Sequence, residues 1–317
     1  MVVQTWIQAL PTPLASRPDG QRWRTRFAPA PTGWLHLGHL VNAIHVWGLA
    51  RSRGGDVVLR LEDHDRTRCR LEFEVGLLAD LEWLGLEPDQ FDVASFRADP
   101  NGHPARQSNQ DARYERELEH LATRSLIYPC VCSRRDIAHR VPHLEGEEPR
   151  YPGTCRMARI DPKVTSARRF IVPPDMVAFH DLRLGWQEQR PAQQCGDFLL
   201  RDRHDHWTYQ YAVVVDDLVH DIDVVIRGED LLASTGRQLM LARALERERM
   251  PVFLHHALLV NPDGRKLSKS HGDTGIREMR AAGWSREALF GMAAHHAGLQ
   301  NDTRPLSLDD VAALFAP

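Results

Sequence analysis

The chain has 317 residues, 42% of them hydrophobic and 26% charged, with a formal net charge of −3. This length allows one large domain with an insertion, or two domains. No stretch approaches the roughly 20 apolar residues that span a bilayer, and the first residues lack the basic start and apolar core of a signal peptide. The weak negative charge excludes a general attraction to polyanions, so an RNA-binding surface must be a local basic patch. We expect a cytoplasmic monomer without a membrane segment.

The first regular element is predicted to be a strand over residues 22–28, which a turn separates from a helix. Two prolines and a glycine within residues 29–33 interrupt regular structure. Apolar residues then recur with helical spacing over residues 40–53, and the glycine pair at 54–55 ends that helix. Residues 1–21, which precede the strand, are expected to form a tail.

Two histidines, His36 and His39, lie between this turn and the first turn of the helix. Backbone N–H groups at the start of a helix are unsatisfied and carry a partial positive charge, which suits a phosphate group. Gly38 has no side chain and would allow a nucleotide to approach both imidazoles closely. The pattern indicates a nucleotide site at the start of this helix.

Two later strands are predicted to end in charged residues. The mostly apolar run 56–61 is followed by Glu62, and the run 222–226 is followed by Arg227. Both runs are typical of buried parallel strands. Because open α/β sheets bind ligands at the carboxyl ends of such strands, both side chains are candidates for a binding site. An arginine at that edge can bind a carboxylate through two hydrogen bonds.

The rest of the chain is predicted to alternate between strands, helices and loops. Residues 85–104 are rich in Asp, Pro and Gly and are expected to form a loop or a short strand. The stretch 167–198 is predicted to be rich in strands, and a further strand is expected at 253–260. Ser108 or Asn109 is expected to cap the helix that follows it. Further helices are predicted over residues 67–84, 109–124, 235–247, 284–297 and 308–315.

Three of the five cysteines cluster in the sequence, as Cys130, Cys132 and Cys155. The odd total of five cysteines and the close spacing of these three favour a reducing compartment and a metal over disulfides. Thiolates bind Zn²⁺ strongly, and a structural zinc site uses four protein ligands, so one more ligand is needed. By chemistry alone an imidazole is the commoner choice. The nearby candidates are His139, His143 and Tyr151. Such a zinc ion would be structural, because a small insertion has too little core to fold alone. Cys69 and Cys195 are expected to be packing residues.

Two distant stretches together resemble the signatures of a known enzyme family. HLGH at residues 36–39 and KLSKS at residues 266–270 resemble the HIGH and KMSKS motifs of class I aminoacyl-tRNA synthetases. The flanking sequences, RFAPAPTG and VIRGED, resemble the glutamyl/glutaminyl branch of that class. The resemblance covers residues 26–273 and implies an α/β, Rossmann-like catalytic domain with a small zinc-binding insertion and short C-terminal helices. The implied limits are 22–125 and 171–260 for the two Rossmann halves, 126–170 for the insertion, and 261–317 for the KLSKS loop and C-terminal helices.

The resemblance implies that ATP, accompanied by Mg²⁺, activates L-glutamate as an adenylate. The implied catalytic residues are His36, His39, Lys266 and Lys269. The implied ATP contacts are His36, Gly38, His39 and Lys269. The implied glutamate contacts are Arg26, Phe27, Ala28, Pro29, Ala30, Glu62, Tyr209 and Arg227. Glu62 would bind the substrate ammonium, and the sequence leaves open whether Arg26 or Arg227 takes the γ-carboxylate. Three positions depart from the family pattern: Ala30 replaces a serine, and Gln210-Tyr211 replaces His-Phe.

The stretch after KLSKS suggests one branch of the family. From Ser270 to residue 317 the chain is too short for a separate anticodon-reading domain of usual size. The chain therefore resembles the short glutamyl-queuosine branch, which transfers glutamate to the queuosine base of tRNA(Asp). In that branch the tyrosine of a Y-x-x-x-C sequence completes the zinc site, and Tyr151 matches it. The alternatives are a synthetase that charges the tRNA 3′ end and a non-catalytic nucleotide- or RNA-binding paralogue.

Overall fold

The computed structural model describes residues 5–18, 20–141, 149–161, 163–259 and 275–317, and all statements below concern these residues. Lys266, Lys269 and His143, three of the residues singled out above, lie outside the described ranges. Within those ranges, no helix is both long enough and apolar enough to cross a membrane.

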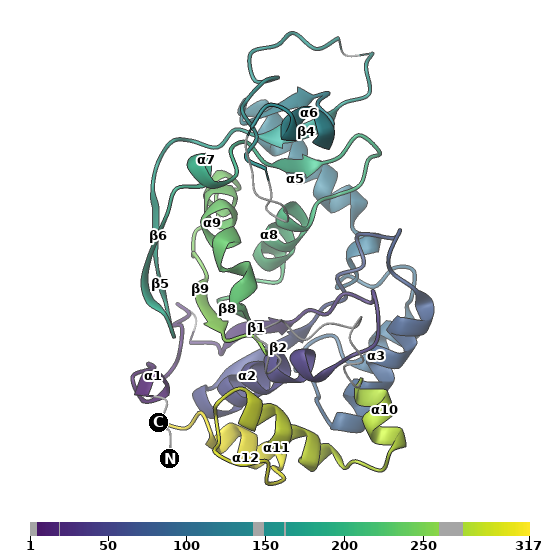
Figure 1. The fold of residues 1–317 in the computed structure, drawn as a ribbon, viewed down its shortest axis with the longest axis vertical. Coiled ribbons are helices and arrows are strands. Elements are labelled where there is room, and N and C mark those ends of the chain that lie inside the picture. Colours follow the sequence, from purple (N-terminus) through teal and green to yellow (C-terminus); the bar gives the residue numbers. More distant parts are fainter. Residues whose placement is uncertain (1–4, 19, 142–148, 162, 260–274) are drawn as a thin grey trace.

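Parallel strands form the centre of the molecule (Figure 1). The first pair is β1 (Trp23–Phe27) with β2 (Gly55–Leu59). The second group is β8 (Val224–Gly228) beside β9 (Val252–His256), which in turn pairs with β5 (Val177–Asp181). The hairpin strand β6 (Gly185–Gln189) runs antiparallel to β5. The two groups adjoin because the Asp223 amide, just before β8, donates a hydrogen bond to the Arg24 carbonyl of β1. The predicted α/β class is therefore confirmed.

Helix α2 (Leu37–Arg53) lies between this sheet and the C-terminal helices (Figure 1). Its apolar residues Ile44, Val46 and Leu49 are fully buried in the main core. Gly48 permits the close contact with the C-terminal helices, because a Cβ there would lie 2.4 Å from the Phe315 ring. The helices concerned are α10 (Ile276–Ala281), α11 (Arg286–His296) and α12 (Leu308–Ala313).

The segment before β1 was predicted to be a tail, and this prediction is wrong for its described part. It contains the short helix α1 (Thr5–Gln8) and buries Ile7, Leu10 and Leu14 in the main core. The buried guanidinium of Arg53, at the end of α2, donates to the carbonyls of Ile7 and Leu10 and, through Nε, to that of Phe315.

A second, antiparallel sheet lies at one end of the molecule (Figure 1). It consists of β3 (Ile127–Cys130), β4 (Ala167–Phe170) and β7 (Leu199–Arg201), with helix α6 (Arg134–Ala138) between β3 and β4 in the chain. Strand β7 lies outside the predicted insertion 126–170 but pairs with β4. The predicted domain limits themselves stay predictions.

Several helix boundaries differ from the predicted ones for local reasons. Helix α3 (Leu71–Leu84) begins after residue 67 because Asp65 accepts hydrogen bonds from Thr67 and fixes a separate turn. Helix α5 (Asp111–Thr123) has no side-chain cap, and the Ser108 hydroxyl donates instead to Asp63. Residues 85–104, predicted to form a loop or a short strand, contain helix α4 (Val93–Ala98), which Asp92 caps. The remaining helices are α7 (Pro191–Gln194), α8 (Tyr209–Val219) and α9 (Thr235–Ala244), with short 3₁₀ helices at Gln107–Asn109 (η1) and Glu229–Ser234 (η2).

Candidate active site

One cavity of about 500 Å³ opens at the carboxyl ends of the parallel strands. Its wall combines the turn after β1, the start of α2, the residue Glu62 after β2, the end of β8 and the residues after β9. Every predicted ATP or glutamate contact within the described ranges lines this cavity: Arg26, Phe27, Ala28, Pro29, Ala30, His36, Gly38, His39, Glu62, Tyr209 and Arg227. The structure therefore brings together residues that are separated by up to about two hundred positions in the sequence.

The described residues that flank the KLSKS segment lie at this cavity or beside a residue of its wall. Leu259, the last described residue before it, lines the cavity. Gly275, the first described residue after it, forms a β-bridge with His36, and the Ile276 amide donates to the Leu35 carbonyl at 3.0 Å.

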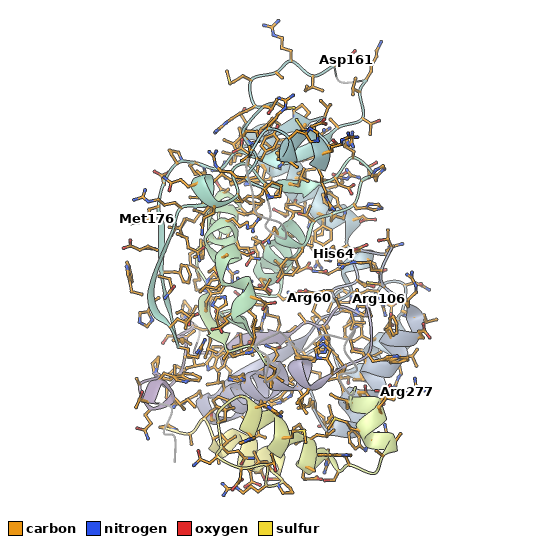
Figure 2. All side chains as sticks on the ribbon, viewed as in Figure 1. Arg60, His64, Arg106, Asp161, Met176 and Arg277 are labelled. Carbon is orange, nitrogen blue, oxygen red and sulfur yellow. The ribbon has the colours of Figure 1, made fainter. Side chains whose placement is uncertain are left out.

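Figure 2 shows the labelled side chains of Arg60, His64 and Arg106 in the middle of the molecule, between Asp161 at one end and Arg277 toward the other.

The two histidines cap the helix they begin. His36 is the N-cap of α2, and its Nδ1 accepts a hydrogen bond from the Gly38 amide at 3.1 Å. The His39 Nδ1 accepts from the His36 amide at 3.2 Å, and the two ring centroids are 4.0 Å apart. Because a neutral imidazole that accepts at Nδ1 carries its proton at Nε2, these contacts fix the tautomer of both rings. Each ring thus has an N–H donor at the nitrogen farther from the backbone.

The structure explains the glycine at position 38 by a contact that the sequence did not suggest. A Cβ at this position would lie 2.9 Å from Cε1 and 3.0 Å from Nδ1 of His36. Both distances are too short for a side chain, so a larger residue would displace the imidazole that caps the helix. The glycine therefore makes room for the His36 ring as well as for a ligand.

A buried ionic network supports the charged side chains at one part of the cavity. Arg60 is fully buried and donates to Asp217 Oδ1 at 2.7 Å and to Glu62 Oε1 at 3.0 Å. Arg26 donates to the same Asp217 oxygen at 3.3 Å. Although burial acts to raise it, the nearby guanidinium groups of Arg26 and Arg60 lower the pKa of Asp217 to about 2. Asp217 is therefore an anion that holds two arginines, one of which orients Glu62.

Sequence reasoning missed Arg60 and Asp217. One signal was present, because Arg60 is the single charged residue within the otherwise apolar run from Val57 to Leu61. A charge inside a buried strand requires a partner. The partner, Asp217, lies on α8, and the distance along the chain hides it from sequence patterns.

Arg227 reaches the cavity from the end of β8 and is held by neutral acceptors, among them the Leu231 carbonyl at 3.4 Å from Nη2. Its Nη1 donates to Gln238 Oε1 at 2.7 Å, its Nη2 to Thr235 Oγ1 at 2.9 Å, and its Nε to His255 Nε2 at 3.1 Å. Burial lowers the pKa of Arg227. Tyr209, the first residue of α8, lines the cavity beside it, and burial together with Glu62 raises the pKa of that phenol.

The charges around this part of the cavity match those of an acidic amino acid. The side chains of Arg26 and Arg227 offer two positive charges, and Glu62 offers one negative charge. Glutamate carries two carboxylates and one ammonium group, so it complements this arrangement group for group. The histidine pair lines the same cavity, and a phosphate beside it would meet N–H donors and a helix N-terminus.

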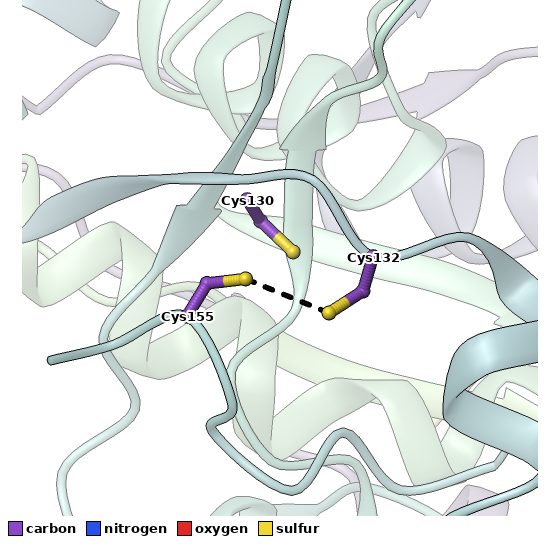
Figure 3. Close-up of side chains that lie close together, drawn as sticks. All are labelled: Cys130, Cys132 and Cys155. Atoms are coloured by element: carbon purple, nitrogen blue, oxygen red, sulfur yellow. Dashed lines mark hydrogen bonds between the residues drawn. The ribbon is translucent and has the colours of Figure 1, made fainter. Parts of the chain in front are cut away.

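The three clustered cysteines converge at the end of β3, whose last residue is Cys130, as Figure 3 shows. Their sulfur atoms all lie within 4.8 Å of one another, and Cys132 Sγ is 3.5 Å from Cys155 Sγ. Tyr151 Oη lies 3.4 Å from Cys130 Sγ and 3.7 Å from Cys132 Sγ. A tetrahedral zinc ion with bonds of about 2.0–2.3 Å separates its ligand atoms by about 3.3–3.8 Å, so these four groups fit a zinc site.

Tyr151 fits the fourth position better than the described histidine. Its oxygen is already among the sulfurs and accepts a hydrogen bond from the Cys155 amide at 2.9 Å. His139 is exposed and does not belong to the cluster. Arg169 donates to Cys130 Sγ at 3.2 Å, and its guanidinium lies 3.7 Å from the Tyr151 ring centroid. This positive charge would offset the surplus negative charge of three thiolates around one divalent ion.

Comparison with known proteins identifies the family. Residues 22–303 match the model of the catalytic domain of class I tRNA synthetases (E and Q). A glutamyl-Q tRNA(Asp) synthetase of Symbiobacterium thermophilum is 41% identical over 92% of this chain and 91% of that protein. A glutamate–tRNA ligase of Alkalilimnicola ehrlichii is 38% identical over 92% of this chain, which spans 63% of that relative. The crystal structure of a glutamate–tRNA synthetase from Elizabethkingia anophelis has a TM-score of 0.75 at 26% identity, covering 92% of this chain and 65% of that one.

The chain therefore belongs to the class I tRNA synthetases for glutamate and glutamine, and it contains their catalytic domain. It is a ligase of the class I aminoacyl-tRNA synthetase type. The family resemblance inferred from HLGH and its flanks is confirmed, and among its relatives are proteins named for glutamyl-Q tRNA(Asp) synthetase activity.

The fit of the sulfur cluster predicts that Tyr151→Phe weakens zinc binding by at least about tenfold, because the ring remains while the ligand oxygen is lost. Zinc per chain, measured by atomic emission after dialysis against graded chelator, reports the change. His139→Ala is the matched control and should retain the wild-type zinc content. Loss of zinc from the His139 variant and not from the Tyr151 variant would exchange the two assignments.

The buried network predicts that Asp217→Asn lowers the free energy of unfolding at pH 7 by about 3–5 kcal/mol, because two buried arginines lose their counter-charge. The pKa of Asp217 is depressed from 3.8 to about 2, so its contribution is complete above that usual value and is lost as the pH falls toward 2. Urea unfolding at several pH values should therefore show the difference between the wild type and the variant shrinking by about 2.4 kcal/mol as the pH falls from 4 to 2 and below. A difference that does not change with pH would contradict this account.

Proposed function

We propose that the protein activates L-glutamate with ATP to form glutamyl-adenylate and transfers the glutamyl group to the queuosine base in the anticodon loop of tRNA(Asp), with release of AMP. One observation carries the first half of the proposal. A histidine pair at a helix N-terminus and a charge set that complements glutamate line the same cavity. The names of the similar proteins support the second half.

In the activation step, a carboxylate oxygen of glutamate attacks the α-phosphorus of ATP, and the bond to pyrophosphate breaks. The reaction requires in-line positioning and neutralisation of charge on the phosphate oxygens, with no covalent protein intermediate. The fixed tautomers of His36 and His39 supply Nε2–H donors for those oxygens. Mg²⁺ would accompany ATP, as in other class I synthetases, and reduce the charge of the phosphates.

The glutamate end of the cavity would orient the attacking group. Glu62, held by Arg60, would bind the ammonium, while Arg26 and Arg227 would bind the two carboxylates. Ala30 offers its backbone and no hydroxyl at this point of the wall. The zinc ion would stabilise the antiparallel sheet through Cys130, Cys132, Tyr151 and Cys155, and no step of the reaction depends on it.

The acceptor is tested with two tRNA preparations, one containing queuosine and one from cells that lack it. Labelled glutamate should be captured by tRNA(Asp) only in the queuosine-containing preparation. Queuosine-free tRNA is a better control than periodate treatment, because periodate destroys the diols of both queuosine and the 3′ terminus. Capture by queuosine-free tRNA(Glu) would favour the alternative of 3′ charging, to which the glutamate–tRNA ligase relatives point. Capture by neither preparation would reject both acceptors.

Lys266 and Lys269 lie outside the described residues, and their roles as cations that clamp the triphosphate stay predictions. Lys269→Ala is expected to lower glutamate-dependent exchange of pyrophosphate into ATP by about 10²–10³-fold, because one charge that stabilises the transition state is lost. The circular dichroism spectrum and melting temperature should remain those of the wild type. Unchanged exchange in this variant would remove the lysine from the mechanism.

A further inference from the structure

A buried histidine and a buried aspartate lie behind the guanidinium of Arg227. Arg227 Nε donates to His255 Nε2 at 3.1 Å, and the opposite ring nitrogen, Nδ1, is 2.7 Å from Asp181 Oδ2. Both His255 and Asp181 are fully buried. They come from neighbouring parallel strands, since His255 lies in β9 and Asp181 ends β5. The three side chains form a chain of hydrogen bonds that runs from the interior of the sheet to the wall of the cavity.

The hydrogen bonds determine which nitrogen of His255 carries the proton. An arginine can only donate, so His255 Nε2 must accept and Nδ1 must carry the proton. The Thr235 hydroxyl, 3.2 Å from the same Nε2, accepts from Arg227 Nη2 and is left with its own proton to donate to the ring. Burial lowers the pKa of His255, which favours the neutral ring that this arrangement requires.

Both carboxylate oxygens of Asp181 accept hydrogen bonds from N–H groups, so the proton between Asp181 and His255 belongs to the ring. Its Oδ1 accepts from the amides of Arg183 and Leu184 at 3.0 and 2.9 Å. Its Oδ2 accepts from the backbone amide of His255 at 3.1 Å, in addition to the ring nitrogen. A carboxylate surrounded by these donors holds the proton of His255 on Nδ1 and keeps Nε2 available to Arg227.

The acceptor on the other side of the guanidinium is fixed in a similar way. Gln238 offers Oε1 to Arg227, and its Nε2 donates to Gln210 Oε1 at 2.8 Å. Gln210 in turn donates to the Ser234 hydroxyl at 3.0 Å. The amide of Gln238 cannot rotate without losing both bonds. Gln210 is the residue that departs from the His of the family pattern, and here it orients the glutamine that holds Arg227.

We propose that His255 and Asp181 are positioning residues that fix the plane of the Arg227 guanidinium so that it can bind a carboxylate of the amino-acid substrate. This inference rests on the proposed activation of glutamate. Neither residue lines the cavity, and each acts through Arg227. The arrangement matters because a bidentate contact between a guanidinium and a carboxylate requires the two groups to be coplanar. A guanidinium that turns about its long side chain binds less tightly without losing its charge.

The test compares two substitutions of His255 in the full chain by glutamate-dependent pyrophosphate exchange. His255→Leu removes the acceptor and should raise the KM for glutamate by about 10- to 100-fold, with the KM for ATP within about twofold of the wild type. His255→Gln can place its amide oxygen where Nε2 stood, so its KM for glutamate should stay within about fivefold of the wild type. A merely structural role would not separate the two Michaelis constants or the two variants.

Two further variants make the comparison decisive. Asp181→Asn places an amide donor beside Nδ1, which favours the wrong tautomer, and should therefore raise the KM for glutamate as His255→Leu does. This variant keeps the test available if His255→Leu fails to fold. His220→Leu is the matched control: His220 is buried, and neither ring nitrogen has a hydrogen-bond partner among the described residues. It should leave both Michaelis constants unchanged.

The outcomes separate this inference from the proposed function. If the wild type shows no exchange with glutamate, the proposed function fails before any variant is considered. If the wild type is active but folded His255→Leu and Asp181→Asn retain its KM for glutamate, the positioning role is wrong and the function stands. Equal increases in the KM for ATP and for glutamate would also overturn the positioning role.

Discussion

The site depends on the pairing of charges that the fold removes from water. Asp217 forms ion pairs with both Arg26 and Arg60, and Arg60 forms a second ion pair with Glu62. An unpaired charge at this depth would cost several kcal/mol, so none of these side chains can move alone. The network is therefore a constraint on conformation as much as a source of stability. It forces one carboxylate and one guanidinium to the cavity wall in a fixed relation.

A similar constraint arises from hydrogen bonds to imidazole rings at two other places along the cavity. Backbone amides of the first turn of α2 fix the tautomers of His36 and His39. Asp181 fixes the tautomer of His255, which in turn holds Arg227. In each case the group that would meet a ligand is oriented by a partner on its far side. The cost of ordering these side chains is met during folding, so a ligand would find donors that already point in usable directions.

Much of the cavity could be predicted from the sequence because its residues follow strands or begin a helix. Glu62 and Arg227 come directly after apolar runs, and Tyr209 was found through resemblance alone. The supporting residues were missed for a physical reason: Asp217, Gln238 and His255 act through contacts between elements that are distant in the sequence. Periodicity reports which face of an element is buried, but not which element lies against it. Cys195 was correctly expected to pack, and it is buried in a core cluster, whereas helix α4 was hidden in a stretch rich in turn-forming residues.

Arg53 links the two ends of the described chain. Its guanidinium binds the carbonyls of Ile7 and Leu10 on one side and that of Phe315 on the other, at the end of the helix that His36 begins. Opening of either end takes a hydrogen bond away from the group that holds the other. The N-terminal segment and α12 should accordingly behave as a single foldon, whose amide protons exchange with solvent together even though about three hundred residues separate them.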